Sequence, residues 1–318
     1  MKVAIFGAVG TIGRSVTAAL LARGDTVRVV ARTETNLRDA FGGSNGVEIV
    51  PADLSTAEGC ARAASGADAI VYAVGLPYTR AAFSAYPSMM HLAVTAARTA
   101  GVRRLLQIAN VYSYGLPHTP RVREDHPREP VAVKGRWRKE QEDVTLACHG
   151  ASGLETLVLR LPDFYGPFAD RSLGNMILSA AAHGGRANMI GPIDTPHEFV
   201  FTPDVGPLVA ALLSHATGWG EAYNFAGVGI ITQRAFAMRA FAMAERRPRL
   251  RVASPRLVRM TGIFSPLMRE LVEMTYLQTH PVLLDDSKLR ALLGTVGKTS
   301  YEEGIQRTLQ QLRVRAAA

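Results

Sequence analysis

The stretch Val3-Ala-Ile-Phe6-Gly7-Ala-Val-Gly10-Thr-Ile-Gly13-Arg14 decides the fold. Its four apolar residues predict a strand over 3–6, and three glycines follow at intervals of three residues. A helical pattern runs from residue 12 to 23, and a β-branched run follows at 26–31. Glycines between a strand and a helix let backbone amides approach a pyrophosphate, and the helix N-terminus adds partial positive charge. The stretch therefore predicts a dinucleotide site formed by Gly7, Gly10, Thr11, Ile12 and Gly13, with a ligand-free structural turn as the alternative.

The rest of the first half repeats this alternation. Strands are expected at 47–50, 69–74, 104–109 and 155–161, and helices at 56–64, 88–100 and 136–148. Strands separated by helices predict a doubly wound α/β fold, a parallel sheet with helices on both faces. The second half predicts helices at 173–182, 207–215 and 232–244 and a short strand at 198–201. We expect a dinucleotide-binding domain over 1–168 and a smaller substrate-binding domain over 169–318. The two are partly interwoven, because strand 198–205 returns to the nucleotide domain.

Composition narrows the class of protein. The chain has 318 residues, 47% of them hydrophobic and 20% charged, which is typical of a globular protein. Only four apolar residues precede Gly7 and no apolar run reaches membrane-spanning length, so we expect a cytoplasmic protein that contacts no membrane. The net charge is +9, with arginines dense between 234 and 259. No nucleic-acid motif or stacking aromatic residues accompany them, which favours a solvated surface over nucleic-acid binding. Neither the two cysteines nor the eight histidines show metal-ligand spacing, so we predict no metal site.

The second strand indicates the type of cofactor. Binders of NAD usually place an acid at its end to accept from the ribose 2′-hydroxyl, but this strand ends at Ala31-Arg32. Arg14 directly follows the third glycine. Guanidinium groups bind phosphate oxygens in pairs, so Arg14 and Arg32 favour the 2′-phosphate of NADP(H). NAD(H) remains the alternative, with one or both arginines merely solvated.

With Asp53-Leu54 after the third strand, the glycine turn resembles the extended short-chain dehydrogenase/reductases, the NAD-dependent epimerase/dehydratase family. Further stretches carry the resemblance: Arg160-Leu-Pro-Asp-Phe-Tyr-Gly-Pro167, His197 to Val205, Leu284-Asp-Asp-Ser-Lys288, Leu293-Gly294 and Glu303-Gly304. The resemblance implies a doubly wound nucleotide domain with a small C-terminal substrate domain. It also implies cofactor contacts for Asp53 and Leu54 along the adenine, for Ala73 and Val74 near the ribose, and for Pro162.

The catalytic residues depart from that family. Its members use Ser or Thr with Tyr-x-x-x-Lys, and this chain contains no Tyr-x-x-x-Lys. With Tyr114 and Glu142 fixing the register, the resemblance places Asn110 at the Ser position, Lys134 at the Tyr position and Arg138 at the Lys position. The local pattern Lys-x-x-x-Arg is similar to isoflavone-reductase-like NADPH reductases, which use a lysine in place of the tyrosine.

These replacements have a chemical interpretation. Lys134 and Arg138 are one helical turn apart and share a face. Arg138 would hold ribose hydroxyls, and its charge would make Lys134 release a proton more readily. Asn110 would donate its amide to a substrate carbonyl. The alternative is that Lys134 is a plain surface lysine in a relative that has lost catalysis.

Tyr112 and Tyr114 follow Asn110, so either would supply a phenol to the substrate, with packing of the loop as the alternative. The resemblance adds Asp163, Tyr165 and His197 as substrate contacts. Asp163 replaces the family's Asn and His197 replaces its Arg, at positions that meet a diphosphate in nucleotide-sugar members. A carboxylate would repel a diphosphate, which argues against a nucleotide-sugar substrate. Apolar residues of the C-terminal half would line a pocket or belong to the core: Met260, Ile263, Phe264, Leu267, Met268 and Met274.

The sequence thus predicts an NADP(H)-dependent oxidoreductase that reduces a small apolar carbonyl or conjugated compound. Two alternatives stay open, an epimerase or dehydratase with bound NAD(P) and a non-catalytic NADP(H)-sensing protein. The resemblance also implies a homodimer as one option for the assembly.

Overall fold

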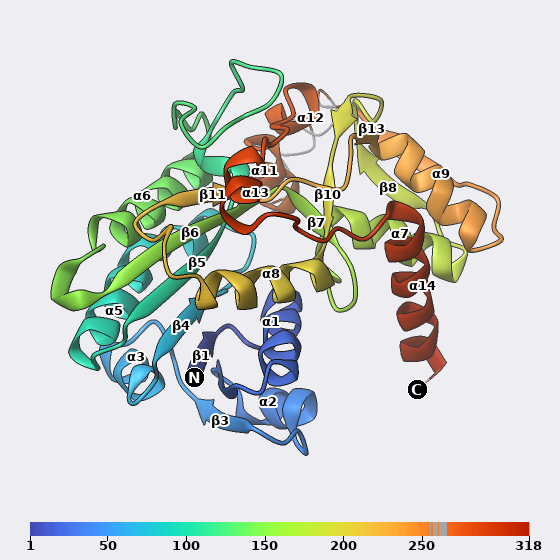
Figure 1. The fold of residues 1–318 in the computed structure, drawn as a ribbon. Coiled ribbons are helices and arrows are strands. Elements are labelled where there is room, and N and C mark those ends of the chain that lie inside the picture. The colour runs from blue at the N-terminus through green and yellow to red at the C-terminus, as the bar shows by residue number, and fades with distance from the viewer. Residues whose placement is uncertain (255, 257–259, 261–265, 318) are drawn as a thin grey trace.

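A central parallel sheet organises the computed structural model, which describes residues 1–254, 256, 260 and 266–317. Its strands are β1 (Lys2–Phe6), β2 (Thr26–Ala31), β3 (Val47–Pro51), β4 (Ala69–Tyr72), β5 (Arg104–Asn110), β6 (Glu155–Leu161) and β11 (Ala222–Asn224). Their order is β11-β6-β5-β4-β1-β2-β3, and every neighbouring pair is parallel (Figure 1). The doubly wound α/β fold predicted from the sequence is confirmed.

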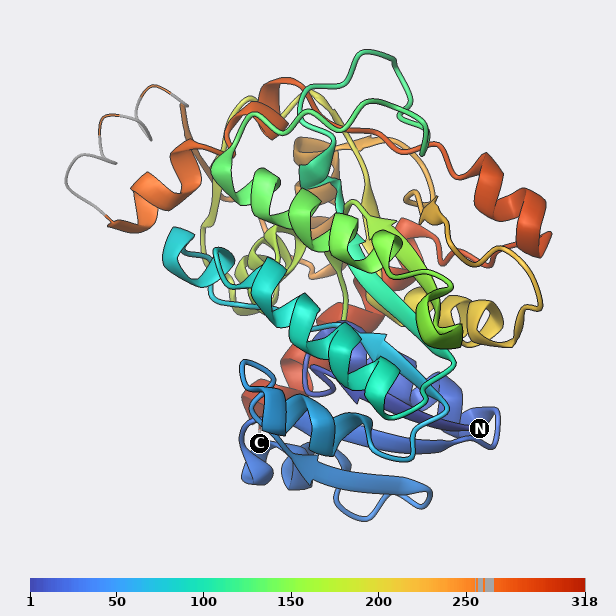
Figure 2. The ribbon, with the colours of Figure 1, turned by 90° about the vertical axis from the view of Figure 1, so that its left-hand side faces the viewer.

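Helices cover both faces of this sheet. One face carries α1 (Thr11–Ala22), α2 (Glu34–Phe41) and α8 (Thr202–Ser214); the other carries α3 (Ala57–Ala64), α5 (Tyr86–Thr99) and α6 (Val133–Ala147), which Figure 2 shows in front. Alternate residues of β1 serve the two faces, because successive strand side chains point in opposite directions. Val3 and Ile5 join the core under α1 and α8, whereas Ala4 and Phe6 join the core under α3 and α5.

A third core lies in the C-terminal part. It is formed by α7 (Leu173–His183), α9 (Gln233–Met243) and α14 (Tyr301–Ala317) around the paired strands β7 (Asp163–Tyr165) and β10 (Phe199–Phe201). The remaining elements are α4 (Arg80–Phe83), η1 (Val111–Ser113), η2 (Ala151–Gly153), β8 (Ala187–Ile190), β9 (Pro196–His197), β12 (Ile231–Thr232), β13 (Leu250–Ala253), α11 (Pro266–Val272), α12 (Tyr276–Thr279) and α13 (Ser287–Leu293). No helix of the described residues combines the length and apolar character needed to cross a bilayer.

The C-terminal half returns to the nucleotide half in two places. Helix α8 packs so closely on α1 that a Cβ at Gly206 would lie 2.2 Å from the carbonyl oxygen of Ser15. Strand β11 extends the central sheet beyond β6. The sequence predicted the returning strand near 198–201 but not β11, and it predicted neither α2 nor α14. Helix α6 also begins at Val133 instead of residue 136, which places Lys134 in its first turn.

Candidate functional site

Glycine is present at the three positions of the turn for different structural reasons. A Cβ at Gly7, where φ is 89°, would lie 2.7 Å from the carbonyl oxygen of Ala73, and a Cβ at Gly13 would lie 2.5 Å from that of Gly7. The fold itself therefore requires both glycines. A Cβ at Gly10 would meet only the carbonyl oxygen of Gly7, at 3.4 Å, so Gly10 leaves room in front of the turn.

That room suits a dinucleotide. Gly10 is the N-cap of α1 and provides no side-chain hydrogen bond, so no cap satisfies the first amides of the helix. Uncapped amides at a helix N-terminus favour a pyrophosphate. Thr11 does not face this space with a free hydroxyl, because Oγ1 donates to the carbonyl oxygen of Pro167 at 2.8 Å and lies 2.9 Å from Oγ1 of Thr202. Ile12 packs against the core under α1.

The other predicted cofactor residues follow the carboxyl ends of neighbouring strands, where ligands of doubly wound sheets bind. They are Asp53 and Leu54 after β3, Ala73 and Val74 after β4, and Pro162 after β6. The carboxylate of Asp53 accepts from the amide of Ser55 at 2.9 Å and from its hydroxyl at 2.7 Å. These bonds lower the pKa of Asp53, and the charge of Arg32 adds to the effect.

Both predicted phosphate-binding arginines lie at this edge. Arg32 is exposed after β2. Arg14 donates from Nε to the carbonyl oxygen of Val9 at 3.1 Å, and its guanidinium lies 4.4 Å from the ring centre of Phe168 and 5.6 Å from that of Phe41. Among the described residues, no carboxylate forms an ion pair with Arg14 or Arg32. Burial, and after it the charge of Arg315, lowers the pKa of Arg14.

Lys134 lies in the first turn of α6 and is fully buried, so it is not a surface lysine. A Cβ at the next residue, Gly135, would lie 2.6 Å from the carbonyl oxygen of Tyr112, which shows that α6 begins directly on the chain after β5. The ammonium donates to Oε1 of Glu273 at 2.6 Å, to the carbonyl oxygen of Glu270 at 3.0 Å and to the Glu270 carboxylate. The rings of Tyr78 and Phe83 lie 4.9 and 5.9 Å from Nζ.

These carboxylates change the expected electrostatics of Lys134. Burial opposes ionisation of Glu270 and Glu273, yet hydrogen bonds from Lys134 and Arg80 hold the pKa of both carboxyls below the usual range. The charged groups that contact the ammonium of Lys134 are therefore these two acids of the C-terminal segment, and not Arg138.

Arg138 is occupied by protein groups. It donates to Oε1 of Gln141 at 2.7 Å and to the carbonyl oxygen of Ile108 at 3.2 Å, and its guanidinium lies 4.5 Å from the ring centre of Tyr86. It is 5% exposed, and its Nε has no hydrogen-bond partner among the described residues. Its clearest role in this structure is to fasten α6 to β5 and α5.

Asn110 and Tyr112 stand where β5 ends. Oδ1 of Asn110 accepts from the amide of Tyr112 at 3.1 Å, and no described residue accepts from its amide nitrogen. The phenols of Tyr112 and Tyr78 are close enough for each to affect the ionisation of the other. Burial raises the pKa of both phenols and of Tyr276, whose buried hydroxyl has no partner among the described residues. Three protonated phenols therefore accompany Lys134.

The remaining predicted substrate residues separate into two places. Nε2 of His197 lies 3.0 Å from Oδ2 of Asp163, so the two replacements at the family's diphosphate positions satisfy each other. Tyr165 is fully buried among the aromatic rings of the C-terminal core and does not line the site, contrary to the sequence prediction. A Cβ at Gly304 would lie 2.2 Å from the Tyr165 hydroxyl, which explains the glycine in the Glu303-Gly304 pattern.

A buried ionic network fixes α6 against the sheet. The guanidinium of Arg160 donates to Oε2 of Glu142 from Nε at 3.0 Å and from Nη2 at 2.9 Å, and both side chains are buried. Ser113 donates to the same carboxylate, and the Tyr114 hydroxyl accepts from Arg160 at 2.7 Å. Burial opposes the charge of Arg160, but Glu142 outweighs it and raises the pKa of the guanidinium.

The sequence prediction missed Tyr78, Glu270, Glu273 and Tyr276, all of which reach the site from loops or short helices. The sequence did contain one signal for them: Glu270 and Glu273 are one helical turn apart, so on a helix their carboxylates would share a face. Of the apolar residues predicted for a pocket or core, Met260 is 65% exposed and Met274 is buried. Ile263 and Phe264 lie outside the described residues, and only the backbone is described for Leu267 and Met268.

Comparison with known proteins agrees with the overall fold. Similar solved structures include a dTDP-glucose 4,6-dehydratase of Streptomyces venezuelae with NAD bound (21% identity, TM-score 0.83, covering 100% of this chain and 98% of that one). They also include a UDP-glucuronic acid 4-epimerase of Bacillus cereus (14%, 0.82, 99% and 100%) and a UDP-glucose 4-epimerase of Thermus thermophilus (20%, 0.79, 98% and 99%). At these identities the likeness shows a shared fold, that of the epimerase/dehydratases. No curated protein sequence matches the chain. The family model described as NAD(P)H-binding matches residues 7–165, half of the chain, and the protein therefore belongs to this NAD(P)H-binding family.

Proposed function

We propose that the protein is an NADP(H)-dependent oxidoreductase that reduces a small, apolar, uncharged carbonyl or conjugated compound, with Lys134 as the proton donor. The observation that carries the proposal is the fully buried ammonium of Lys134, held by two carboxylates beside the end of β5. Removing such an ion pair from water carries a large desolvation penalty. In the proposed reduction, this cost is accepted to place an acidic N–H group beside the end of β5. Reduced nicotinamide, when bound, supplies the hydride.

The chain's own groups account for the rest of the reduction. Asn110 has an amide nitrogen free to donate to a substrate oxygen. Lys134 gives one proton to that oxygen, and the neutral amine is then reprotonated through Glu273, whose side chain is 11% exposed and reaches solvent. All three N–H bonds of the ammonium are engaged, so Lys134 must release one acceptor to meet the substrate.

Preference for NADP(H) is supported by Arg14 and Arg32, neither of which is paired with a carboxylate of the described residues. The absence of an acid at the end of β2 supports the same cofactor. An uncharged substrate is supported by the Asp163–His197 pair, because a carboxylate at that position repels a diphosphate.

Dinucleotide sensing without turnover is the second candidate. The three hydrogen bonds from Lys134 to Glu270 and Glu273 favour this function, because the ammonium then only holds α11 against α6. An epimerase or dehydratase with bound NAD(P) stays a third option, favoured by the fold of the similar structures.

One set of measurements separates these functions. Purified protein is titrated with NADPH and NADH and then assayed for NADPH oxidation with aldehydes, ketones and enones. Turnover that Lys134→Met abolishes supports the reductase, and Lys139→Met, on the exposed face of the same helix, is the matched control. Tight NADPH binding without turnover of any compound supports the sensor. Binding of dTDP- or UDP-sugars by the wild-type protein contradicts the proposed substrate class.

A further inference from the structure

Phe168 has an unusual conformation beside the glycine turn. Its φ is 63°, a left-handed value that residues with a side chain rarely adopt, and 42% of the residue is exposed. The hydroxyl of Thr11 holds the carbonyl of the preceding Pro167, which fixes this loop on the start of α1. A strained backbone that presents an exposed ring next to a ligand-binding turn points to a function for the ring.

Two guanidinium groups lie on this ring. That of Arg14 is 4.4 Å from the ring centre of Phe168, and that of Arg315 is 5.5 Å from it. Arg315 comes from the last turns of α14, which Figures 1 and 2 show extending from the C-terminal core toward the N-terminal helices. Arg315 and Arg14 are close enough for the charge of one to affect the ionisation of the other. Two cations on one exposed ring repel each other, and an anion bound between them relieves the repulsion.

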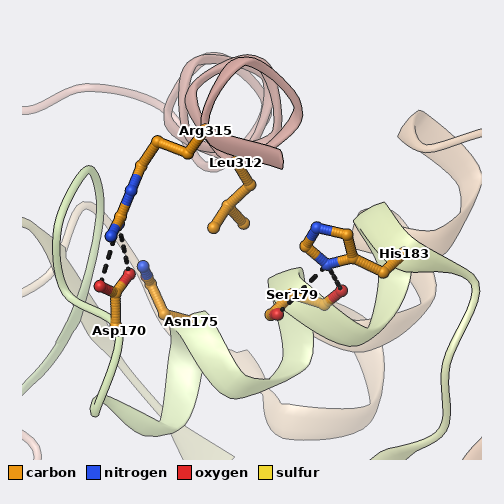
Figure 3. A pocket seen from close by; sticks show the side chains of 6 residues that line it. All are labelled: Asp170, Asn175, Ser179, His183, Leu312 and Arg315. Atoms are coloured by element: carbon orange, nitrogen blue, oxygen red, sulfur yellow. Dashed lines mark hydrogen bonds and ion pairs between the residues drawn. The ribbon is translucent and has the colours of Figure 1, made fainter. Parts of the chain in front are cut away.

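The carboxylates of the described residues neutralise these two guanidinium groups only in part. In the part of the chain that the structure describes, no carboxylate pairs with Arg14, and only Asp170 pairs with Arg315. Figure 3 shows Arg315 facing Asp170 across the edge of a cavity of about 280 Å³, with Nη1 3.0 and 2.9 Å from the two carboxylate oxygens. This pair is about half exposed, so solvent weakens it and a doubly charged phosphate competes with it.

We propose that Arg315 joins Arg14 in binding the 2′-phosphate of NADP(H), with Phe168 holding the two guanidiniums side by side. The last helix of the C-terminal part thereby becomes a determinant of cofactor specificity. The inference rests on the proposed function. It adds Arg315, which lies outside the N-terminal half, as a second arginine beside Arg14.

Calorimetric titration of the full chain with NADPH, NADH, 2′,5′-ADP and 5′-AMP tests the inference. Arg315→Gln removes the charge, and we expect about tenfold weaker binding of NADPH and 2′,5′-ADP, with NADH and 5′-AMP unchanged within about twofold. Arg313→Gln is the matched control, because Arg313 lies on the same helix and donates to the carbonyl oxygen of Ala244; we expect no change. Asp170→Asn removes the competing carboxylate and is expected to tighten 2′,5′-ADP binding.

The outcomes are distinguishable. If Arg315→Gln leaves the NADPH-to-NADH affinity ratio unchanged, or weakens both nucleotides equally, the inference is wrong while the proposed function stands. If the wild-type protein binds neither nucleotide, the proposed function itself fails. If inorganic phosphate binds in an Arg315-dependent way but NADPH does not, the site serves a free anion and the inference is overturned.

Discussion

Nζ of Lys134 lies 2.6 Å from Oε1 of Glu273, a residue 139 positions further along the chain. This ion pair joins the first turn of α6 to the segment that follows α11. Arg80 reaches the same two acids, with its amide 2.9 Å from Glu270 and its guanidinium 3.0 Å from Glu273. The candidate site is therefore complete only when the C-terminal segment is docked on both α4 and α6.

Glu273→Gln tests whether this carboxylate positions Lys134 for proton delivery. The amide keeps the shape but loses the charge, so we expect kcat for NADPH oxidation to fall by about ten- to a hundredfold, with NADPH affinity unchanged. Glu302→Gln, in an exposed pair with Arg239, is the control and should retain full activity. An unchanged kcat and an unchanged pH profile in Glu273→Gln would show that the carboxylate has no part in the reaction.

The glycine turn offers a comparison between two alanine substitutions. Gly10→Ala adds a methyl group where the protein has room, so we expect unfolding stability to fall by only about 0.5–1 kcal/mol. Dinucleotide affinity should fall at least about tenfold, because the methyl group occupies the place of the pyrophosphate. Gly13→Ala forces a methyl group to within 2.5 Å of a carbonyl oxygen and should lower the melting temperature markedly. Thermal melts and calorimetric titrations measure both effects, and full cofactor affinity in Gly10→Ala would contradict the placement of the ligand.

Glu142→Ala should strongly destabilise the fold. It leaves the buried guanidinium of Arg160 without its carboxylate, and breaking such a pair costs about 3–5 kcal/mol. Lys139→Ala removes a partly exposed ion pair on the same helix and should cost less than about 1 kcal/mol. Urea unfolding followed by circular dichroism measures both changes. Equal losses in the two variants would mean that the Arg160–Glu142 pair does not hold α6 in place.

Acid should release α11 from α6. The folded-state pKa of Glu273 and of Glu270 lies below the usual value of 4.5, so the stabilisation from these carboxylates is present above about pH 4.5 and is lost as the pH falls through the lower, folded-state pKa. Hydrogen–deuterium exchange of residues 266–277 should therefore accelerate, relative to the central strands, as the pH falls from 5 to about 3. In Glu273→Gln the protection should already be reduced at pH 7. Exchange in this segment that keeps pace with the central strands would contradict the prediction.

The nucleotide half was predictable because its signals are local. The apolar run before Gly7 and the helical pattern after it lie within about twenty residues of each other, and the repeated alternation fixes the sheet. The helix α14 also had a usable signal, since Ile305, Leu309 and Leu312 repeat at helical spacing and are buried in the C-terminal core. Strand β11 had none, because three residues are too few to show an alternation.

The environment of Lys134 was not predictable from its neighbours. Arg138, one turn away, was the charged neighbour that the sequence indicated, but its guanidinium donates to Gln141 and to the carbonyl of Ile108. The decisive partners, Glu270 and Glu273, are brought in by tertiary folding from a distant segment. Local sequence indicates which residue types are present at such a site. Which charged side chains contact Lys134 depends on tertiary contacts that only the complete fold makes.

The position of β11 has a consequence for synthesis of the protein on the ribosome. Until residue 224 has emerged, the outer edge of β6 has no strand beside it, although the six other strands and the whole glycine turn are already available. An unpaired edge is a template for pairing with other chains, so the nascent protein has an aggregation-prone interval during translation. In the complete chain the three-residue β11 replaces the seven-residue β6 as the edge of the sheet, and a very short edge strand pairs less readily with other chains. We expect a gene fragment that ends before β11 to aggregate more readily than the full chain.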